Sequence, residues 1–280
     1  MALYLRIHFV LFMFFQIKSY LKFLWQSKNE HGVHSPFVFD LVTKCFYDKK
    51  SKLDPSGSEQ GKQYQVLKNY QNSLLKNTNT IEVTDFGAGS KVFKSNIRPI
   101  SKIAKTAGIS QKRAELLYRI TNYFQPSTIL ELGTSLGLAT VALALGAKNA
   151  SIRTIEGCPN TMAIAKKQLH LFKFNTVECI TSEFNDYLNN CKLKTENCQL
   201  IFFDGNHSKT ATLQYFELLV PTITNESVWI FDDIHWSAEM EEAWQIIKKH
   251  PKVTVTIDTF QWGIVFFRRE QAKEHFVIRV

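Results

Sequence analysis

The chain has 280 residues, of which 45% are apolar and 21% charged, an ordinary globular composition that excludes disordered, collagen-like and multi-span membrane proteins. The length allows one large domain or a domain with an appendage, so burial of a core is not limiting. The five cysteines, an odd number, include no CxxC pair. This predicts neither a disulfide framework nor a zinc site, and it favours a reducing, cytoplasmic compartment.

The net charge of +9 is unevenly distributed. Residues 1–124 hold 19 Lys and Arg against 8 Asp and Glu, whereas residues 125–280 hold 15 against 17. This contrast indicates two parts with different roles. The basic part could face nucleic acid, anionic lipid or an acidic substrate, or it could present a solvated helical surface. Nucleic acid is not the expected partner, because the basic helices lack the interleaved aromatic residues of RNA-binding surfaces.

The N-terminal segment, residues 1–25, is rich in apolar and aromatic side chains. Its continuous apolar run at 8–15 is shorter than the roughly 20 residues that a membrane-spanning helix needs, and no cleavage site of a signal peptide follows it. We expect a helix that packs on the protein body or contacts another copy in an oligomer. Peripheral contact with a membrane surface is the alternative, because aromatic residues lie between lysines up to Trp25.

The remainder of residues 1–124 is expected to be mostly helical. Ser35 and Pro36 are typical of an N-cap and the first helical residue, and a polar stretch at 48–62 with Pro and Gly predicts a loop. A glycine turn at 85–90 lacks a following strand that ends in an acid, so we expect a loop that leads into helices over a ligand site and acts as a lid. The predicted helices are residues 37–46, 62–75, 100–106 and 111–124.

From residue 126 onward, short β-rich runs alternate with helical runs. This order predicts an α/β, Rossmann-like doubly wound sheet over residues 125–280, with helices on both faces. Residues 253–259 and 263–267 are joined by a tight loop and predict a terminal antiparallel β-hairpin. The other predicted strands are residues 128–132, 151–156, 176–180, 199–204 and 227–232, and the predicted helices are residues 138–147, 160–172, 183–189, 209–219 and 238–250.

The strand at 128–132 runs into a glycine-rich turn, ELGTSLG, that opens a helix. Gly133 and Gly137 would let a ligand approach the backbone, and the helix N-terminus offers free N–H groups. The turn lacks the G-x-G-x-x-G pattern that holds the pyrophosphate of a dinucleotide. The carboxylate of Glu131 suits a ligand that bears an amino group instead.

A second acidic residue, Glu156, ends the next strand and follows Gly137 by 19 residues. A carboxylate at this place can accept hydrogen bonds from both hydroxyls of a ribose. Exposed glutamates are common, so it is the spacing from the glycine turn that makes this residue a candidate.

Together these motifs make residues 126–267 resemble class I S-adenosylmethionine-dependent methyltransferases. The E-x-G-x-S-x-G form of the turn is similar to that of catechol-type small-molecule O-methyltransferases, whose sheet also ends in a reversed last strand. The resemblance implies S-adenosylmethionine as cofactor, with its methionine part at residues 133–137, its ribose on Glu156 and its adenine near Ser182. The cofactor-binding residues implied are Glu131, Gly133, Thr134, Ser135, Gly137, Glu156, Ser182 and Asp204. The HGVHSPF stretch at 31–37 also resembles the opening of a group of bacterial methyltransferases, a likeness that implies no function.

The apolar strand at 199–204 delivers Asp204 to the carboxyl edge of the sheet, where ligands bind in such folds. In the catechol-type family the equivalent aspartate binds a divalent metal, and a lysine three residues later deprotonates the acceptor. This chain has His207 at the lysine position. Imidazole titrates near neutrality and can act as a general base, so Asp204 and His207 are the expected catalytic residues. The departure from lysine leaves the acceptor open.

Asp232 and Asp233 end the following strand, where metal-dependent members of that family carry Asp-Asn. With Asp204 they would form a hard-oxygen site for a divalent cation such as Mg²⁺. The alternative is that these acids orient the substrate or cap a helix without a metal.

The sequence therefore predicts an S-adenosylmethionine-dependent O-methyltransferase that acts on a small hydroxylated molecule, with residues 1–124 on the acceptor side. Methylation of RNA or protein through the basic N-terminal part is one alternative. A nicotinamide-dependent oxidoreductase, or a non-catalytic binding protein on a similar sheet, is another. The missing G-x-G-x-x-G and the terminal hairpin argue against a nicotinamide cofactor.

Overall fold

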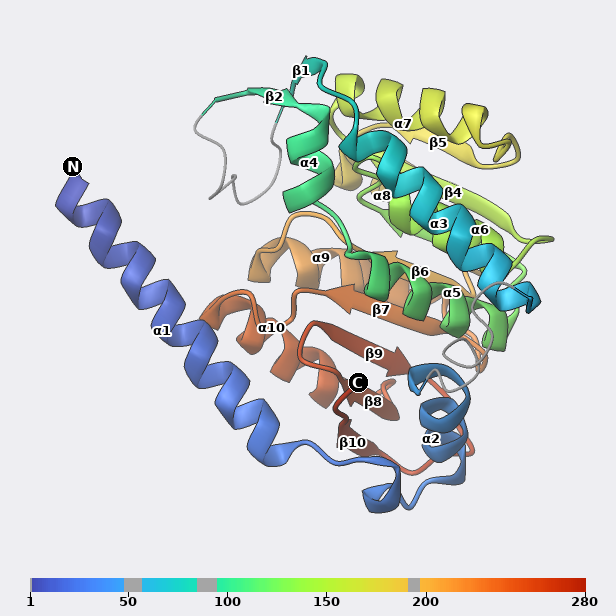
Figure 1. Ribbon diagram of the computed structural model, residues 1–280. Helices are drawn as coiled ribbons and strands as arrows, with labels where there is room; N and C mark the ends of the chain where they lie inside the picture. The colour runs from blue at the N-terminus through green and yellow to red at the C-terminus, as the bar shows by residue number, and fades with distance from the viewer. Residues whose placement is uncertain (1, 48–56, 85–94, 191–196) are drawn as a thin grey trace.

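An eight-stranded sheet forms the centre of the molecule (Figure 1). The computed structural model describes residues 2–47, 57–84, 95–190 and 197–280, with side chains from residue 12 onward. The strands of this sheet are β3 (Thr128–Leu132), β4 (Ser151–Glu156), β5 (Glu178–Thr181), β6 (Leu200–Phe203), β7 (Val228–Asp232), β8 (Val255–Asp258), β9 (Trp262–Phe266) and β10 (Glu274–Val277). Their order is β10-β8-β9-β7-β6-β3-β4-β5. The strands from β7 to β5 are mutually parallel, whereas β9 is antiparallel to both β7 and β8.

Helices cover both faces of this sheet, because successive side chains of a strand point to opposite faces. On β3, Ile129 joins the core cluster that includes α2, α3, α5 and α6, whereas Leu130 joins the cluster that includes α8, α9 and α10. The helices are α1 (Ala2–Gln26), α2 (Pro36–Leu41), α3 (Glu59–Leu75), α4 (Ile100–Thr106), α5 (Gln111–Phe124), α6 (Leu138–Gly146), α7 (Pro159–Leu171), α8 (Phe184–Asn190), α9 (Lys209–Leu219) and α10 (Ala238–Lys249). The predicted doubly wound fold is confirmed.

The terminal hairpin forms as predicted, but the sheet does not end with it. β10 adds a further strand parallel to β8, which the sequence analysis missed. Its four residues follow a polar stretch, and Phe276 is the one among them that is buried, so the strand has little apolar pattern to reveal it. A second, two-stranded sheet was also missed, in which β1 (Thr80–Glu82) pairs antiparallel with β2 (Ile97–Pro99).

The N-terminal region is mostly helical, as expected, and its helices share a core with the sheet. Leu67 of α3 and Leu117 of α5 belong to the same cluster of buried side chains as Ile129. The helix predicted from residue 62 begins earlier, at Glu59, because the Ser58 hydroxyl accepts a hydrogen bond from the backbone N–H of Gly61. Most of the predicted loop at 48–62 and the predicted lid at 85–90 lie outside the described residues.

The helix expected at 1–25 is α1, which runs along the side of the molecule next to α10 and the β8–β9 hairpin (Figure 1). After α1 the chain crosses to the last strand of the sheet. There Lys28 forms a parallel bridge with Ile278, and its N–H donates to the carbonyl of Val277 at 2.8 Å. Segments from the two ends of the chain are therefore hydrogen-bonded to each other.

Candidate active site

The turn between β3 and α6 requires glycine at two positions. Gly133 has φ +109°, and a Cβ there would lie 2.2 Å from the backbone carbonyl oxygen of Asp204, which directly follows the neighbouring strand β6. Gly137 has φ +84° and would place a Cβ 2.6 Å from the hydroxyl of Tyr70. Both positions combine a left-handed backbone with a close neighbour, conditions that only glycine meets without strain.

Tyr70 of α3 supports this turn from the N-terminal region. Its buried hydroxyl donates to the backbone carbonyl of Leu136 at 2.8 Å, and burial raises the pKa of its hydroxyl, so it stays a donor. Tyr70 could not be found from the sequence, since nothing in the helical pattern of α3 distinguishes it from an ordinary core residue.

Glu131 is fully buried between β3, β4 and α6. Its Oε2 accepts hydrogen bonds of 2.5 Å from the hydroxyls of Thr140 and Thr154, while its Oε1 has no hydrogen-bond partner among the residues that the structure describes. Burial raises the pKa of this carboxyl to about 7. Its side chain therefore links α6 to β4 and does not line the cavity described next.

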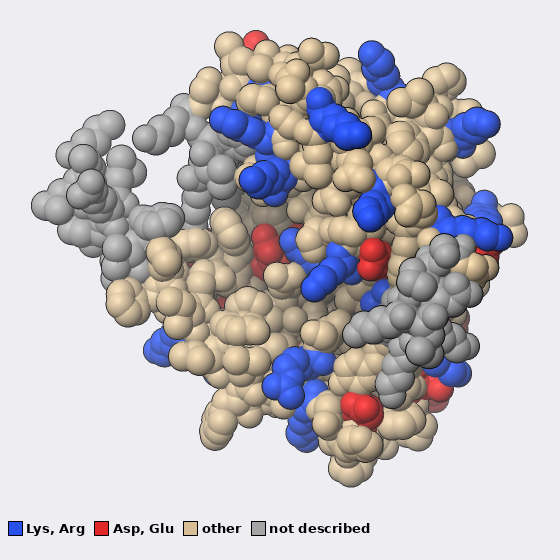
Figure 2. Space-filling model, viewed as in Figure 1, with Lys and Arg blue, Asp and Glu red and all other residues tan. Residues whose placement is uncertain are grey.

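A cavity of about 290 Å³ lies at the carboxyl edge of the parallel strands. This volume is close to the lower limit for sites that hold a small ligand, about 300 Å³. The described residues that line it are Val83, Thr84, Arg98, Ile103 and Ala107 from the N-terminal region, together with Gly133, Ser135, Glu156, Gly157, Thr161, Glu183, Phe184, Asn185, Asp204, Gly205, Asn206, His207 and Tyr215. On the corresponding face, acidic atoms lie in a hollow that is surrounded by Lys and Arg side chains (Figure 2).

Four of the predicted cofactor residues line this cavity, namely Gly133, Ser135, Glu156 and Asp204. Thr134, Gly137 and Ser182, like Glu131, do not. Thr134 instead places its hydroxyl 2.5 Å from that of Thr154, and Ser182 is followed directly by three residues that do line the cavity, Glu183 to Asn185.

Glu156 is held in place at the end of β4 by two backbone N–H groups. One oxygen accepts from Ser135 at 2.9 Å and the other from Cys158 at 3.0 Å. The carboxylate therefore connects the glycine turn to the start of α7 while it faces the cavity.

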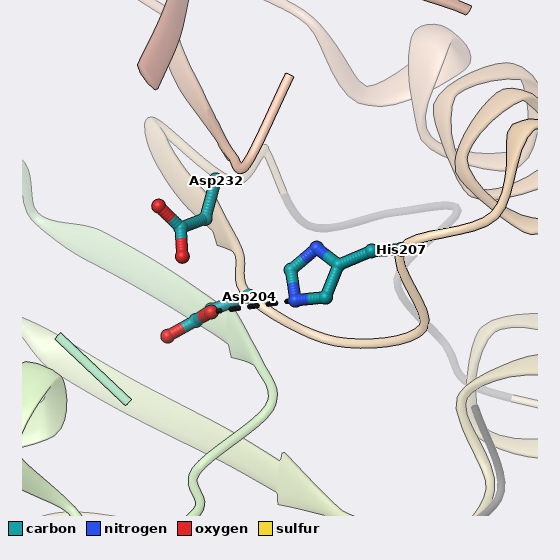
Figure 3. A group of neighbouring side chains, drawn as sticks. All are labelled: Asp204, His207 and Asp232. Carbon is teal, nitrogen blue, oxygen red and sulfur yellow. Dashed lines mark ion pairs between the residues drawn. The ribbon is translucent and has the colours of Figure 1, made fainter. Parts of the chain in front are cut away.

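Asp204, His207 and Asp232 form the one group of possible metal ligands found among the described residues, each offering an atom within 4.8 Å of the others. Figure 3 shows them where β6 and β7 end, with an ion pair between Nε2 of His207 and Oδ1 of Asp204 at 3.9 Å. Asp233, which the sequence analysis placed in this group, lies outside it. Its backbone is left-handed, with φ +53°. His207 takes its place.

The carboxyl groups of this cluster affect one another. Burial, together with the charges of Asp232 and Asp233, raises the pKa of Asp204 well above its usual range. Burial and the charge of Asp232 raise the pKa of Asp233 to about 6. A cation at this place would relieve the repulsion.

One such cation belongs to the chain itself. Arg113, on α5, donates from Nη1 to Oδ1 of Asp232 at 2.9 Å, and Asp232 is only 5% exposed. From the sequence, Arg113 belongs only to a basic helix, because the 119 positions that separate it from Asp232 give no local signal of their contact.

Residues 130–234 match a protein family described as a methyltransferase domain. This part of the chain is a methyltransferase domain. The resemblance to class I S-adenosylmethionine-dependent methyltransferases that the motifs implied is thereby confirmed, and the domain supports the expectation of an enzyme. Among curated protein sequences, none matches this chain significantly.

Solved structures of methyltransferases share the fold at low sequence identity. An O-methyltransferase from Bacillus cereus in complex with SAH is 17% identical, with a TM-score of 0.52, over 81% of this chain and 99% of that one. An SAH-bound methyltransferase from Podospora anserina is 14% identical, with a TM-score of 0.55, over 79% and 97%. The O-methyltransferase TomG from Streptomyces achromogenes, involved in tomaymycin synthesis and complexed with SAM, is 17% identical, with a TM-score of 0.50, over 57% and 82%.

Within the described residues, no helix has the length and the apolar character needed to cross a membrane.

Proposed function

We propose that the protein transfers the methyl group of S-adenosylmethionine to an oxygen of a small hydroxylated molecule. The observation that carries this proposal is that one cavity contains both parts of the predicted machinery. Ser135 and Glu156 lie at its cofactor side, and Asp204 and His207 line the same cavity. O-methyltransferases share the fold, which agrees with transfer to oxygen.

The residues of the cavity fit the cofactor. Gly133 brings its backbone to the wall of the cavity, Glu156 offers its carboxylate to ribose hydroxyls, and Phe184 offers an apolar ring for the adenine. When bound, S-adenosylmethionine supplies a methyl group on a positively charged sulfur, which an oxygen displaces in line. Glu131 acts behind this site by holding α6 against β4.

His207 is the proposed base. Its side chain is about one-quarter exposed and lines the cavity, so a hydroxyl can reach it. Nε2 of His207 takes the acceptor proton, the oxygen forms its new bond to the methyl carbon, and the bond from that carbon to sulfur breaks. Oδ1 of Asp204 stands 3.9 Å from Nε2, so its charge would stabilise the imidazolium that forms, and Asp204 is placed to orient the acceptor oxygen.

A metal-dependent form of the same reaction is the second candidate, favoured by the cluster of Asp204, His207 and Asp232. Their oxygen and nitrogen donors fit a divalent cation, which would make the acceptor hydroxyl more acidic. His207 cannot then act as the base, because Nε2 is the atom that faces Asp204. Arg113 favours the metal-free form, since it already neutralises Asp232.

The N-terminal region is proposed to form the acceptor side. Val83, Thr84 and Ile103 line the same cavity as His207, so this region closes the space in front of the base and restricts water. The fold shared with O-methyltransferases supports a small acceptor over RNA or protein.

The first test is calorimetric titration with S-adenosylmethionine and S-adenosylhomocysteine, with NADH alongside. We expect binding of the two sulfur compounds and its loss in Glu156→Ala, whereas Glu178→Ala, an exposed glutamate on the next strand, binds as the wild type does. Failure of the wild type to bind either compound would remove the proposal.

The second test measures transfer of a labelled methyl group to hydroxylated small molecules, to RNA and to protein. His207→Ala is expected to keep its affinity for S-adenosylhomocysteine and to lose about 100-fold or more in rate. His170→Ala, at the end of α7, serves as the control. If chelation of metals abolishes methyl transfer and His207→Ala weakens binding of Mn²⁺, the metal-dependent form is correct. If the label appears in RNA or protein and not in a small molecule, the proposed small acceptor is wrong.

A further inference from the structure

The outward face of α1 is an apolar stripe with nothing covering it among the described residues. Phe14, Ile17, Leu21 and Trp25 recur at helical spacing, and all four are exposed, Phe14 by 68% and Trp25 by 86%. Contiguous exposed apolar surface of this kind marks a contact site with another molecule or a membrane.

The opposite face of α1 is fixed to the protein body, so the orientation of the stripe is defined. Gln16 donates from Nε2 to the backbone carbonyls of His235 and Trp236, both at 2.7 Å. Phe23 is buried and packs on Phe260, with ring centroids 5.5 Å apart. Because α1 is anchored in this way, it cannot turn its apolar stripe inward.

Basic side chains flank the stripe without acidic partners on the helix. Residues 12–29 contain Lys18, Lys22 and Lys28 but neither Asp nor Glu. The neighbouring helix α10 adds Lys248 and Lys249 in its last turn, whereas its first turn carries Glu239 and Glu241. On α1 itself the charges beside the stripe are therefore all positive.

We propose that α1 docks the protein, through Phe14, Ile17, Leu21 and Trp25, on the surface of an anionic phospholipid bilayer. An exposed apolar face bordered by lysines is the arrangement of helices that lie in a membrane interface, and tryptophan favours that region. A second copy of the chain fits less well, because two such helices would face each other with lysines and no acid between them. The proposal concerns binding and is independent of methyl transfer.

Docking would also place a second cavity near the lipid headgroups. This cavity, of about 1000 Å³, is lined by Tyr20 and Phe23 from the inner side of α1, by Phe260, and by Arg113, the partner of Asp232. A helix with its side chains is only about 10 Å across. The cavity on the inner side of α1 would therefore lie close to the membrane that the outer side contacts.

The test is sedimentation of the full chain with vesicles of phosphatidylcholine, with and without phosphatidylglycerol. We expect binding that requires phosphatidylglycerol, falls with salt and weakens about fivefold for each lysine replaced in Lys18→Gln and Lys22→Gln. Leu21→Glu is expected to abolish it. Leu171→Glu, at a residue 68% exposed at the end of α7, is the matched control and should bind normally.

Fluorescence gives a second readout. Trp229, Trp244 and Trp262 are buried, and Trp236 is partly buried on the inner side of α1 against Phe12. Trp25 is 86% exposed, so quenching by brominated lipid should come mainly from Trp25 and should largely disappear in Trp25→Phe. Absence of vesicle binding by the wild type, or equal loss in Leu21→Glu and Leu171→Glu, would overturn the proposal. So would a dimer in sedimentation velocity that Leu21→Glu dissociates while vesicles remain unbound, since the stripe would then join two copies.

Discussion

Arg113 on α5 and Asp232 at the end of β7 are joined by a hydrogen-bonded ion pair of 2.9 Å. Through this contact the N-terminal region reaches the acidic cluster at the sheet edge. It supplies a fixed positive charge where Asp204 and Asp232 would otherwise repel each other. The pair therefore connects the stability of the site to the docking of α5.

Replacing Arg113 by Met should leave Asp232 buried without its partner. We expect a loss of about 2 kcal/mol in the free energy of unfolding, below the usual value for a fully buried pair because Arg113 is partly exposed. Urea denaturation at neutral pH measures this loss. The double variant Arg113→Met, Asp232→Asn should recover most of the stability, and a double variant no more stable than the single one would contradict the charge argument.

Gly133→Ala should be much more harmful than Gly108→Ala, although both residues have positive φ. At Gly108 the nearest atom to a Cβ is the Ser135 hydroxyl at 3.9 Å, whereas at Gly133 a backbone oxygen lies at 2.2 Å. We expect about 1–2 kcal/mol of backbone strain for Gly108→Ala and about 3–5 kcal/mol for Gly133→Ala, where a clash is added. Urea unfolding checks both values. Similar losses of stability in the two variants would show that backbone strain, and not the close approach of Gly133 to the end of β6, is the reason that glycine is required.

Tyr70→Phe removes the hydroxyl that holds the carbonyl of Leu136. The expected loss is about 1 kcal/mol of stability, with weaker binding of S-adenosylhomocysteine because the glycine turn is less well fixed. Tyr118→Phe is the control, since the hydroxyl of Tyr118, also on a buried side chain, forms no hydrogen bond with the described residues. Calorimetry should show weaker affinity for the Tyr70 variant alone; unchanged affinity would mean that the turn does not depend on α3.

His235 should make the stability depend on pH on the alkaline side. Burial opposes its charged form, but hydrogen bonds with Asp258 and Glu241 outweigh burial and raise the pKa of His235 to about 9. A histidine with a raised pKa contributes its full stability below about pH 6.5 and loses it as the pH rises through about 9. The contribution is on the order of 3 kcal/mol.

Thermal unfolding from pH 6 to 10 measures this effect. His235→Asn should flatten the alkaline decline. His275→Asn should leave it unchanged, because burial lowers the pKa of His275 and its protonation costs stability only towards acid pH. An alkaline decline that persists in full in His235→Asn would show that another group causes it.

The sequence predicted the parallel strands and the glycine turn because both depend on local patterns. From the sequence, Glu131 was expected to face the cofactor. In the structure, the alternation along β3 puts Glu131 on the same face of the sheet as Ile129, where it packs against α6. A count of strand parity could have shown this. His207 was found by its spacing from Asp204, but its inclusion in the cluster in place of Asp233 depends on a left-handed backbone at 233 that no motif reports.

Contacts between distant segments were the part that could not be predicted. Arg113 has no neighbour in sequence that points to Asp232, and β10 has too few apolar residues to be distinguished from a loop. The face of α1 that packs inward is likewise decided by residues of the C-terminal part, such as Phe260.

The attachment of α1 also determines when this helix can fold into place during synthesis. Gln16 is bound to a residue 219 positions later, and Lys28 is bridged to Ile278. At a translation rate of about 5–20 residues per second, roughly 10–45 s pass between the synthesis of α1 and that of its partner at residue 235. Throughout that interval both the inner and the outer face of the helix are exposed on the nascent chain. We therefore expect α1 to dock late, and a chain stalled before residue 235 to be sensitive to proteases within α1.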